Sequence, residues 1–163
     1  MIQVRIAGLS LDPVTEQPVL LLVRSDDPSP NPHRALPIWI GHAEASAIIL
    51  ALQGIEAPRP MTHDLLHATI GTLGFFVSRV EITRLEEGTF YAAIVLRGEE
   101  RELAVDARPS DSVALAVRAG CPIFVAEEIF AEAAVEVTEV DEEEEVEKFR
   151  DFLDHVDPSD FMS

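Results

Sequence analysis

The chain has 163 residues, a net charge of −18 and a hydrophobic content of 47%, which fits one domain with a short appendage. Its single cysteine, Cys121, excludes an intrachain disulfide, and no stretch approaches the roughly 18 apolar residues needed to span a membrane. The N-terminus lacks the basic segment and long apolar run of a signal peptide, so we expect a cytoplasmic protein that does not bind membranes.

The negative charge is concentrated near the C-terminus. Residues 127–163 hold 15 acidic and 2 basic side chains, a net of −13, whereas residues 1–126 hold 15 acidic and 10 basic side chains, a net of −5. The run DEEEE (Asp141 to Glu145) is typical of a solvated spacer or an interaction tail, and it repels a phosphate backbone. We predict a domain over residues 1–133 and an acidic tail with a short amphipathic helix over residues 134–163.

The first half of the chain predicts strands followed by helices. Alternating or continuous apolar residues indicate three strands, at residues 1–11, 18–24 and 35–40, with a Pro-rich surface loop at 25–34. Two helices follow, at residues 42–54 and 63–73. We expect Thr62 to cap the second helix and Leu66, Ile70 and Leu73 to form its apolar face.

The second half predicts a meander of three antiparallel strands, because tight turns join residues 75–85, 90–97 and 101–107. Ser110 then caps a helix at 111–119 that is apolar nearly all round and should be buried. A short strand at 120–126 and a short helix at 127–134 follow, and residues 135–140 form either an edge strand or an extended tail. The mixture predicts an α+β fold, with a mixed, twisted sheet and helices packed on it.

Two of the helix starts share one pattern. The stretches RPMTHD (Arg59 to Asp64) and DARPSD (Asp106 to Asp111) each contain an Arg-Pro pair, a hydroxyl residue and an aspartate. An aspartate in the first turn stabilises a helix by ~0.3–1 kcal/mol, which alone could explain Asp64 and Asp111. The helix dipole gives no such reason for His63, although a lone histidine is most commonly a surface residue.

Four carboxylates lie at predicted strand ends or helix starts, namely Glu44, Asp64, Asp106 and Asp111. If these ends converge, the carboxylates can hold Mg²⁺ or Mn²⁺, Arg59 and Arg108 can bind phosphate, and His63 can move a proton. That combination suits metal-assisted phosphodiester hydrolysis. The same residues would equally serve as Asp–Arg salt bridges that brace the loops.

Other chemistries find less support. The sequence has no P-loop, dinucleotide-binding fingerprint, nucleophile elbow or Cys-x-x-Cys motif, so we predict no organic cofactor. His63 and His67 have the spacing of zinc ligands, but Asp64 replaces the glutamate of the zinc-protease motif, which argues against a zinc site.

Five blocks, in this order and spacing, resemble the bifunctional nuclease family over about residues 1–133: LPIWIGHAEASAI, RPMTHDLL, GTFYAAIVL, DARPSDSVALAVR and PIFV. The end of the chain resembles actinobacterial members. The family is named for a plant member described as degrading DNA and RNA. The resemblance implies an α+β fold, a homo-oligomer (dimer or higher) and nuclease (hydrolase) activity on DNA or RNA.

Eight residues match the family's polar motif positions: Glu44, Arg59, His63, Asp64, Asp106, Arg108, Ser110 and Asp111. We assign roles to them as a hypothesis. Catalysis falls to His63, Asp64, Asp106 and Asp111, phosphate binding to Arg59, Arg108 and Ser110, and metal binding to Glu44, Asp64, Asp106 and Asp111.

Two features depart from expectation: the loop at 25–34 is longer than a tight hairpin, and the body has no basic groove. The alternative is therefore a non-catalytic regulatory module that binds an anion or a protein.

Overall fold

A computed structural model describes residues 1–137 and 150–151 and contains a mixed sheet of eight strands, in the order β6-β5-β4-β7-β1-β2-β3-β8. The strands are β1 (Ile2–Leu11), β2 (Pro18–Arg24), β3 (Arg34–Trp39), β4 (Phe76–Glu86), β5 (Thr89–Arg97), β6 (Glu102–Ala107), β7 (Ile123–Val125) and β8 (Val135–Glu136). The helices of the described part are α1 (His42–Leu52), α2 (Thr62–Thr72), α3 (Pro109–Ala119) and α4 (Glu127–Ala133). The predicted α+β class is confirmed.

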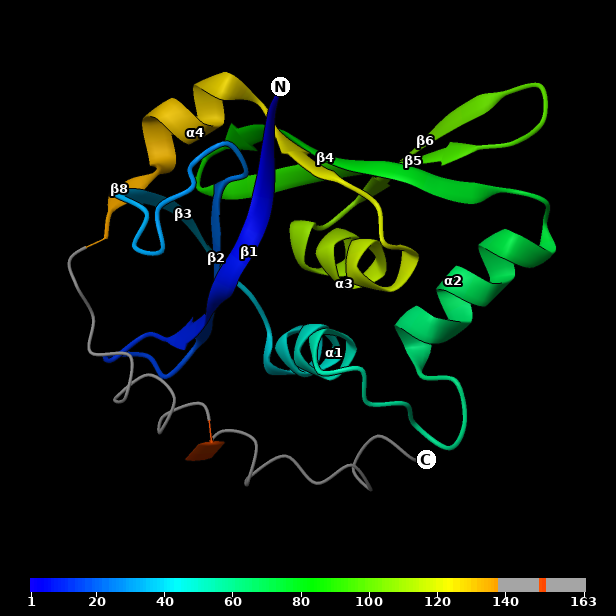
Figure 1. Cartoon of the computed structure of the whole chain (residues 1–163), viewed down its shortest axis with the longest axis horizontal. Helices are drawn as coiled ribbons and strands as arrows, with labels where there is room; N and C mark the ends of the chain where they lie inside the picture. Colours follow the sequence, from blue (N-terminus) through cyan, green and yellow to red (C-terminus); the bar gives the residue numbers. More distant parts are fainter. Residues whose placement is uncertain (138–149, 152–163) are drawn as a thin grey trace.

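Two antiparallel meanders, β1–β2–β3 and β4–β5–β6, form most of the sheet. Strand β7 joins them, because it pairs antiparallel with β1 and parallel with β4. Strands β4 and β5 cross the view in Figure 1 while β1 and β2 run down it, so the sheet curves round α1 and α3. Helix α3 packs on β4 and β5, and α1 packs on α3 and β2.

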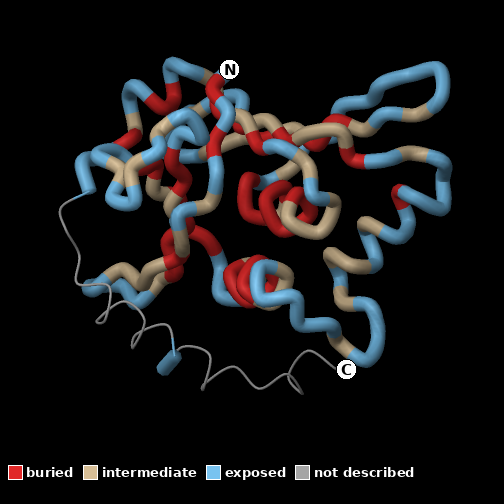
Figure 2. The backbone as a smooth tube through the Cα atoms, in the orientation of Figure 1, coloured by how far each residue is buried: buried red, intermediate tan, exposed pale blue. Residues whose placement is uncertain are grey.

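The core lies between the concave face of the sheet and helices α1 and α3, whose middle turns are drawn as buried in Figure 2. Helix α3 is buried from Ser112 to Ala116, which confirms the prediction made from its apolar composition. In α1 the buried residues run from Ala45 to Ile49. Full burial of a large aliphatic side chain such as Ile48 or Leu115 stabilises the fold by ~1.5–3 kcal/mol.

Both predicted caps are wrong. Met61 is the N-cap of α2, and the side chain of Asp64 accepts the backbone N–H of Met61 at 3.0 Å, so Thr62 is already helical. Helix α3 begins at Pro109, with Arg108 as its N-cap. Proline suits the first helical position because it has no N–H to leave unbonded, and the early start carries Ser110 inside the helix.

The predicted apolar face of α2 is only partly correct. Ile70 is buried, whereas Leu66 is 38% and Leu73 is 69% exposed. Residues 135–136 form the edge strand β8, which pairs with β3. The predicted amphipathic helix of the tail lies almost wholly outside the described residues. No helix within the described ranges is long and apolar enough to cross a membrane.

Candidate active site at the first turns of helices α2 and α3

The first turns of α2 and α3 meet through a histidine and an aspartate. His63 Nε2 lies 2.9 Å from Asp111 Oδ1, although the two residues are 48 positions apart in the chain. The contact is possible because α2 and α3 pack against each other. The side chains are 13% and 29% exposed, so the pair is shielded from most of the solvent.

Arg108 extends this pair into a network of four side chains. Its Nε donates to Asp111 Oδ2 and its Nη2 donates to Glu44 Oε1, both at 2.8 Å. The network Glu44–Arg108–Asp111–His63 therefore joins α1, α2 and α3. The Arg108 side chain is 65% exposed, which makes it the member most accessible to an anionic ligand.

The charges in the network determine which ring nitrogen of His63 carries the hydrogen. Burial raises the pKa of Asp111, but hydrogen bonds from Arg108 and His63 outweigh it and hold the pKa below the usual value. An ionised carboxylate only accepts hydrogen bonds, so His63 donates through Nε2. In the neutral imidazole Nδ1 is then a proton acceptor. The same carboxylates, Asp111 first and then Glu44, raise the pKa of Arg108.

A second ion pair, which the sequence did not predict, lies beside the network. Arg118, in the last turn of α3, donates from Nε to Asp64 Oδ1 at 2.7 Å and from Nη1 to the carbonyl of Ala114 at 2.8 Å. The Arg118 side chain is only 9% exposed. Burial raises the pKa of Asp64, but hydrogen bonds from Arg118 and Met61 hold it below its usual value. The sequence contained one signal for Arg118. It lies seven residues after Asp111, so the two side chains are on the same face of α3.

Besides Asp64, three predicted residues lie outside the network. Asp106 lies on β6, opposite Ala93 of β5. Its neighbours Val105 and Ala107 pair with the buried Ile94 and Ala92. Because side chains alternate along a strand, Asp106 projects from the face opposite the helices.

The other two are Arg59 and Ser110. Arg59 is exposed in the connector between α1 and α2, and it makes no ion pair or hydrogen bond within residues 1–137 and 150–151. Ser110 is 6% exposed, which does not suit it for direct contact with a phosphate.

The carboxylates, as arranged, do not form a cation site. Glu44 and Asp111 share Arg108, Asp64 binds Arg118, and Asp106 is on the other face of the sheet. In the part of the chain that the structure describes, no three His, Cys, Asp or Glu side chains are grouped as a metal ion requires. A divalent ion between Glu44 and Asp111 would have to replace the guanidinium of Arg108.

The comparisons with known proteins agree with the residue blocks. A family model described as the bifunctional nuclease domain matches residues 24–138. An uncharacterized protein of Mycobacterium tuberculosis strain H37Rv is 47% identical over 137 residues, 84% of this chain and 79% of that protein. Bifunctional nuclease 1 of Oryza sativa subsp. japonica is 27% identical over 107 residues, 64% of this chain and 32% of the rice protein. The chain therefore belongs to the bifunctional nuclease domain family.

Proposed function

We propose that this protein is a nuclease that hydrolyses phosphodiester bonds in DNA or RNA at the network Glu44–Arg108–Asp111–His63. The observation that carries the proposal is the 2.9 Å contact between His63 and an aspartate that a cationic, exposed arginine also binds. A carboxylate that orients an imidazole is a common arrangement for proton transfer. Membership of a family with plant bifunctional nucleases among this chain's relatives supports the same reaction.

In the proposed reaction His63 Nδ1 takes a proton from water while Nε2 remains bonded to Asp111. The water oxygen forms a bond to phosphorus, the bond from phosphorus to the leaving oxygen breaks, and His63 returns the proton to that oxygen. Arg108 uses Nε and Nη2 within the protein, which leaves Nη1 for a phosphate oxygen. Arg59, exposed at the α1–α2 connector, supplies a second cation for the substrate.

That the nuclease activity depends on Mg²⁺ or Mn²⁺ stays a prediction. The proposed proton transfer by His63 does not involve a metal. The test is a nuclease assay on the purified chain with labelled single-stranded DNA and RNA, in Mg²⁺, Mn²⁺ or EDTA. Proton transfer of this kind contributes ~10²–10⁴-fold to a rate, so we expect His63→Ala and Asp111→Asn each to lower kcat by about that factor. His67→Ala, one turn further along α2, is the matched control and should keep the parent activity. Activity that survives both His63→Ala and Asp111→Asn would exclude this site.

The non-catalytic module is the second candidate, and one observation favours it. Glu44, Asp64 and Asp111 are each paired with an arginine, as expected if these residues brace α1, α2 and α3. A non-catalytic module that binds an anion or a protein predicts no cleavage of nucleic acid under any metal condition, whether or not nucleic acid binds. Fluorescence anisotropy with Arg59→Gln, beside a cleavage gel on the same samples, separates the two candidates.

A further inference from the structure

A hollow lies at the other end of the molecule from the His63 network, where the long loop at residues 25–34 meets α4. It has a volume of about 500 Å³, within the ~300–1,000 Å³ range of small-molecule sites. An adjoining hollow of about 400 Å³ shares Ile2, Arg24 and Glu127 with it. Helices α4 and α2 lie at opposite ends of the long axis in Figure 1, so this hollow is separate from the His63 network.

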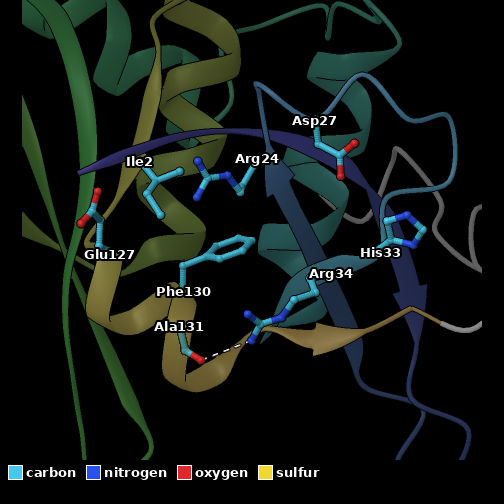
Figure 3. A pocket seen from close by; sticks show the side chains of 8 residues that line it. All are labelled: Ile2, Arg24, Asp27, His33, Arg34, Glu127, Phe130 and Ala131. Carbon is cyan, nitrogen blue, oxygen red and sulfur yellow. Dashed lines mark hydrogen bonds between the residues drawn. The ribbon is translucent and has the colours of Figure 1, made fainter.

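Two arginines that line the hollow have N–H groups that are not used in the hydrogen bonds of the described residues. Arg24, at the end of β2, binds Asp26 through Nε and Nη2, and Arg34, at the start of β3, binds the carbonyls of Ala131 and Ala134 through Nη2. Within the described ranges, Arg24 Nη1 and Arg34 Nη1 and Nε make no hydrogen bond. In Figure 3 the ring of Phe130 lies between the two guanidinium groups. An anion in the hollow could therefore be bound by cationic donors from two sides.

The rest of the lining is apolar at the base and acidic at the rim. Ile2 and Phe130 are 9% and 4% exposed and supply the apolar base. Asp27 and Glu127 line the hollow as well, and their carboxylates can accept hydrogen bonds from a ligand. A simple inorganic anion would gain nothing from these acids, whereas a ligand with both an anionic group and N–H or O–H donors would use all the groups.

We propose that this hollow binds a nucleoside monophosphate. Its phosphate would take the free N–H groups of Arg24 and Arg34, its sugar hydroxyls or base amino group would donate to Asp27 and Glu127, and its base would cover Ile2 and Phe130. The proposal also gives the long loop a role, because that loop carries Asp27 and leads into Arg34. It does not depend on catalysis at His63, so either proposal can fail without the other.

The test is a titration of the full ¹⁵N-labelled chain with adenosine and cytidine monophosphates, followed by ¹H–¹⁵N NMR, with adenosine and inorganic phosphate as separate arms. We expect saturable shifts in residues 24–34 and 127–131, at least tenfold weaker binding of adenosine and of phosphate, and a loss of about tenfold in affinity in Arg24→Gln. Arg84→Gln is the control, because Arg84 lines neither hollow and its guanidinium lies over the Tyr91 ring, and it should bind like the parent.

Arg34→Gln tests the second cation, and its folding is checked by the dispersion of the same spectra because Arg34 also holds two carbonyl groups. No saturable shift with either nucleotide overturns the proposal. Equal affinity for inorganic phosphate overturns the nucleotide assignment, and shifts centred on His63 and Asp111 would place the ligand in the other site.

Discussion

Asp111 accepts a hydrogen bond on each carboxylate oxygen, from His63 on one and from Arg108 on the other. The two donors come from different segments, so the ionised form of Asp111 holds α2 to the start of α3. The pKa of Asp111 is lowered for the same reason, because these hydrogen bonds make the folded chain favour the charged carboxylate. Protonation of Asp111 should therefore loosen the site before it unfolds the protein.

Acid should weaken the fold through Asp111 in a defined direction. Because the folded pKa lies below the unfolded value of ~3.9, its contribution is complete above that value and is lost as the pH falls toward the folded pKa. Chemical denaturation of the parent and of Asp111→Asn, from pH 7 to pH 3, measures this contribution. We expect the difference in the free energy of unfolding to be largest at pH 7 and to shrink below about pH 4.

The matched control is Asp106→Asn, which removes an exposed carboxylate that makes no hydrogen bond or ion pair in the described part of the chain. Its stability difference from the parent should stay within about 0.5 kcal/mol at all pH values, as is usual for surface substitutions. A difference for Asp111→Asn that does not change with pH would show that the pairing with His63 and Arg108 is absent in solution.

The position of His63 should depend on Arg118, whose side chain is only 9% exposed. Its guanidinium binds Asp64, the residue next to His63, and ties the first turn of α2 to the last turn of α3. Arg118→Gln leaves Asp64 without its charged partner, so we expect a loss of about 1–3 kcal/mol of stability. Lysine keeps the charge but not the planar fork, and Arg118→Lys should recover only part of that loss.

A purely structural role for Arg118 would lower stability and leave the His63 ring unchanged. We therefore expect Arg118→Gln also to shift the NMR signals of the His63 ring at a temperature where the variant is fully folded. Ring signals identical to those of the parent would contradict the positioning role.

Helix α2 is held to the body by few apolar contacts. Ile70 is its one buried residue, whereas Leu65 and Leu73 are 58% and 69% exposed. Much of its docking must come from the polar contacts of its first turn, His63–Asp111 and Asp64–Arg118. An element with little buried apolar surface is expected to open locally at a lower free energy than the core.

Two truncations on α2 separate the buried side from the exposed side. Ile70→Ala removes buried surface and should cost about 2–4 kcal/mol. Leu73→Ala removes the same kind of side chain from the exposed side and should cost less than about 0.5 kcal/mol. Thermal or urea denaturation measures both, and hydrogen exchange should show faster exchange of α2 amides in Ile70→Ala. Equal costs for the two variants would mean that α2 packs differently in solution.

The elements could be predicted from the sequence because their signals are local. Alternating or continuous apolar runs predicted the strands of both meanders, and the apolar composition of α3 predicted its burial. The predicted starts of α2 and α3 were wrong by one and two residues, because Met61 and Pro109 occupy positions that a search for hydroxyl caps does not find. Cap choice depends on backbone geometry that short motifs specify only loosely.

The site was harder to predict because its contacts join distant segments. The pattern at the two helix starts singled out His63, Arg108 and Asp111, and the structure brings these three side chains together. It also included Asp106, which belongs to a strand whose two faces become distinguishable only when the helices cover one of them. Arg118 was missed because nothing local shows that its partner is in another helix.

Oligomerisation stays a prediction from the family resemblance. Leu103 and Val105 on the edge strand β6 are 39% and 44% exposed, so this edge of the sheet presents exposed apolar side chains. Light scattering should therefore give a mass that is a multiple of the 17.9 kDa chain. A single-chain mass at every concentration up to the millimolar range would contradict the expectation.

The charge distribution bears on whether the whole chain can bind nucleic acid. Residues 138–163 hold 11 acidic and 2 basic side chains, a net of −9, which is half of the total of −18. Negative charge repels a phosphate backbone, and at 0.1 M salt this repulsion is screened over ~10 Å. Residues up to Val137 should be kept in a truncated chain, because Val137 donates its N–H to the carbonyl of His33.

Truncation after Val137 should raise the affinity for single-stranded DNA, because it removes repulsion of the phosphate backbone. Fluorescence anisotropy at 50 and 200 mM salt measures this, and the gain should be largest at the lower salt, where screening is weakest. Replacing the acids of residues 141–145 by glutamine in the full chain tests the charge without shortening it. Affinities that are unchanged in both variants at both salt concentrations would rule out an electrostatic role for the tail and leave the sparse positive charge of the body as the limit on binding.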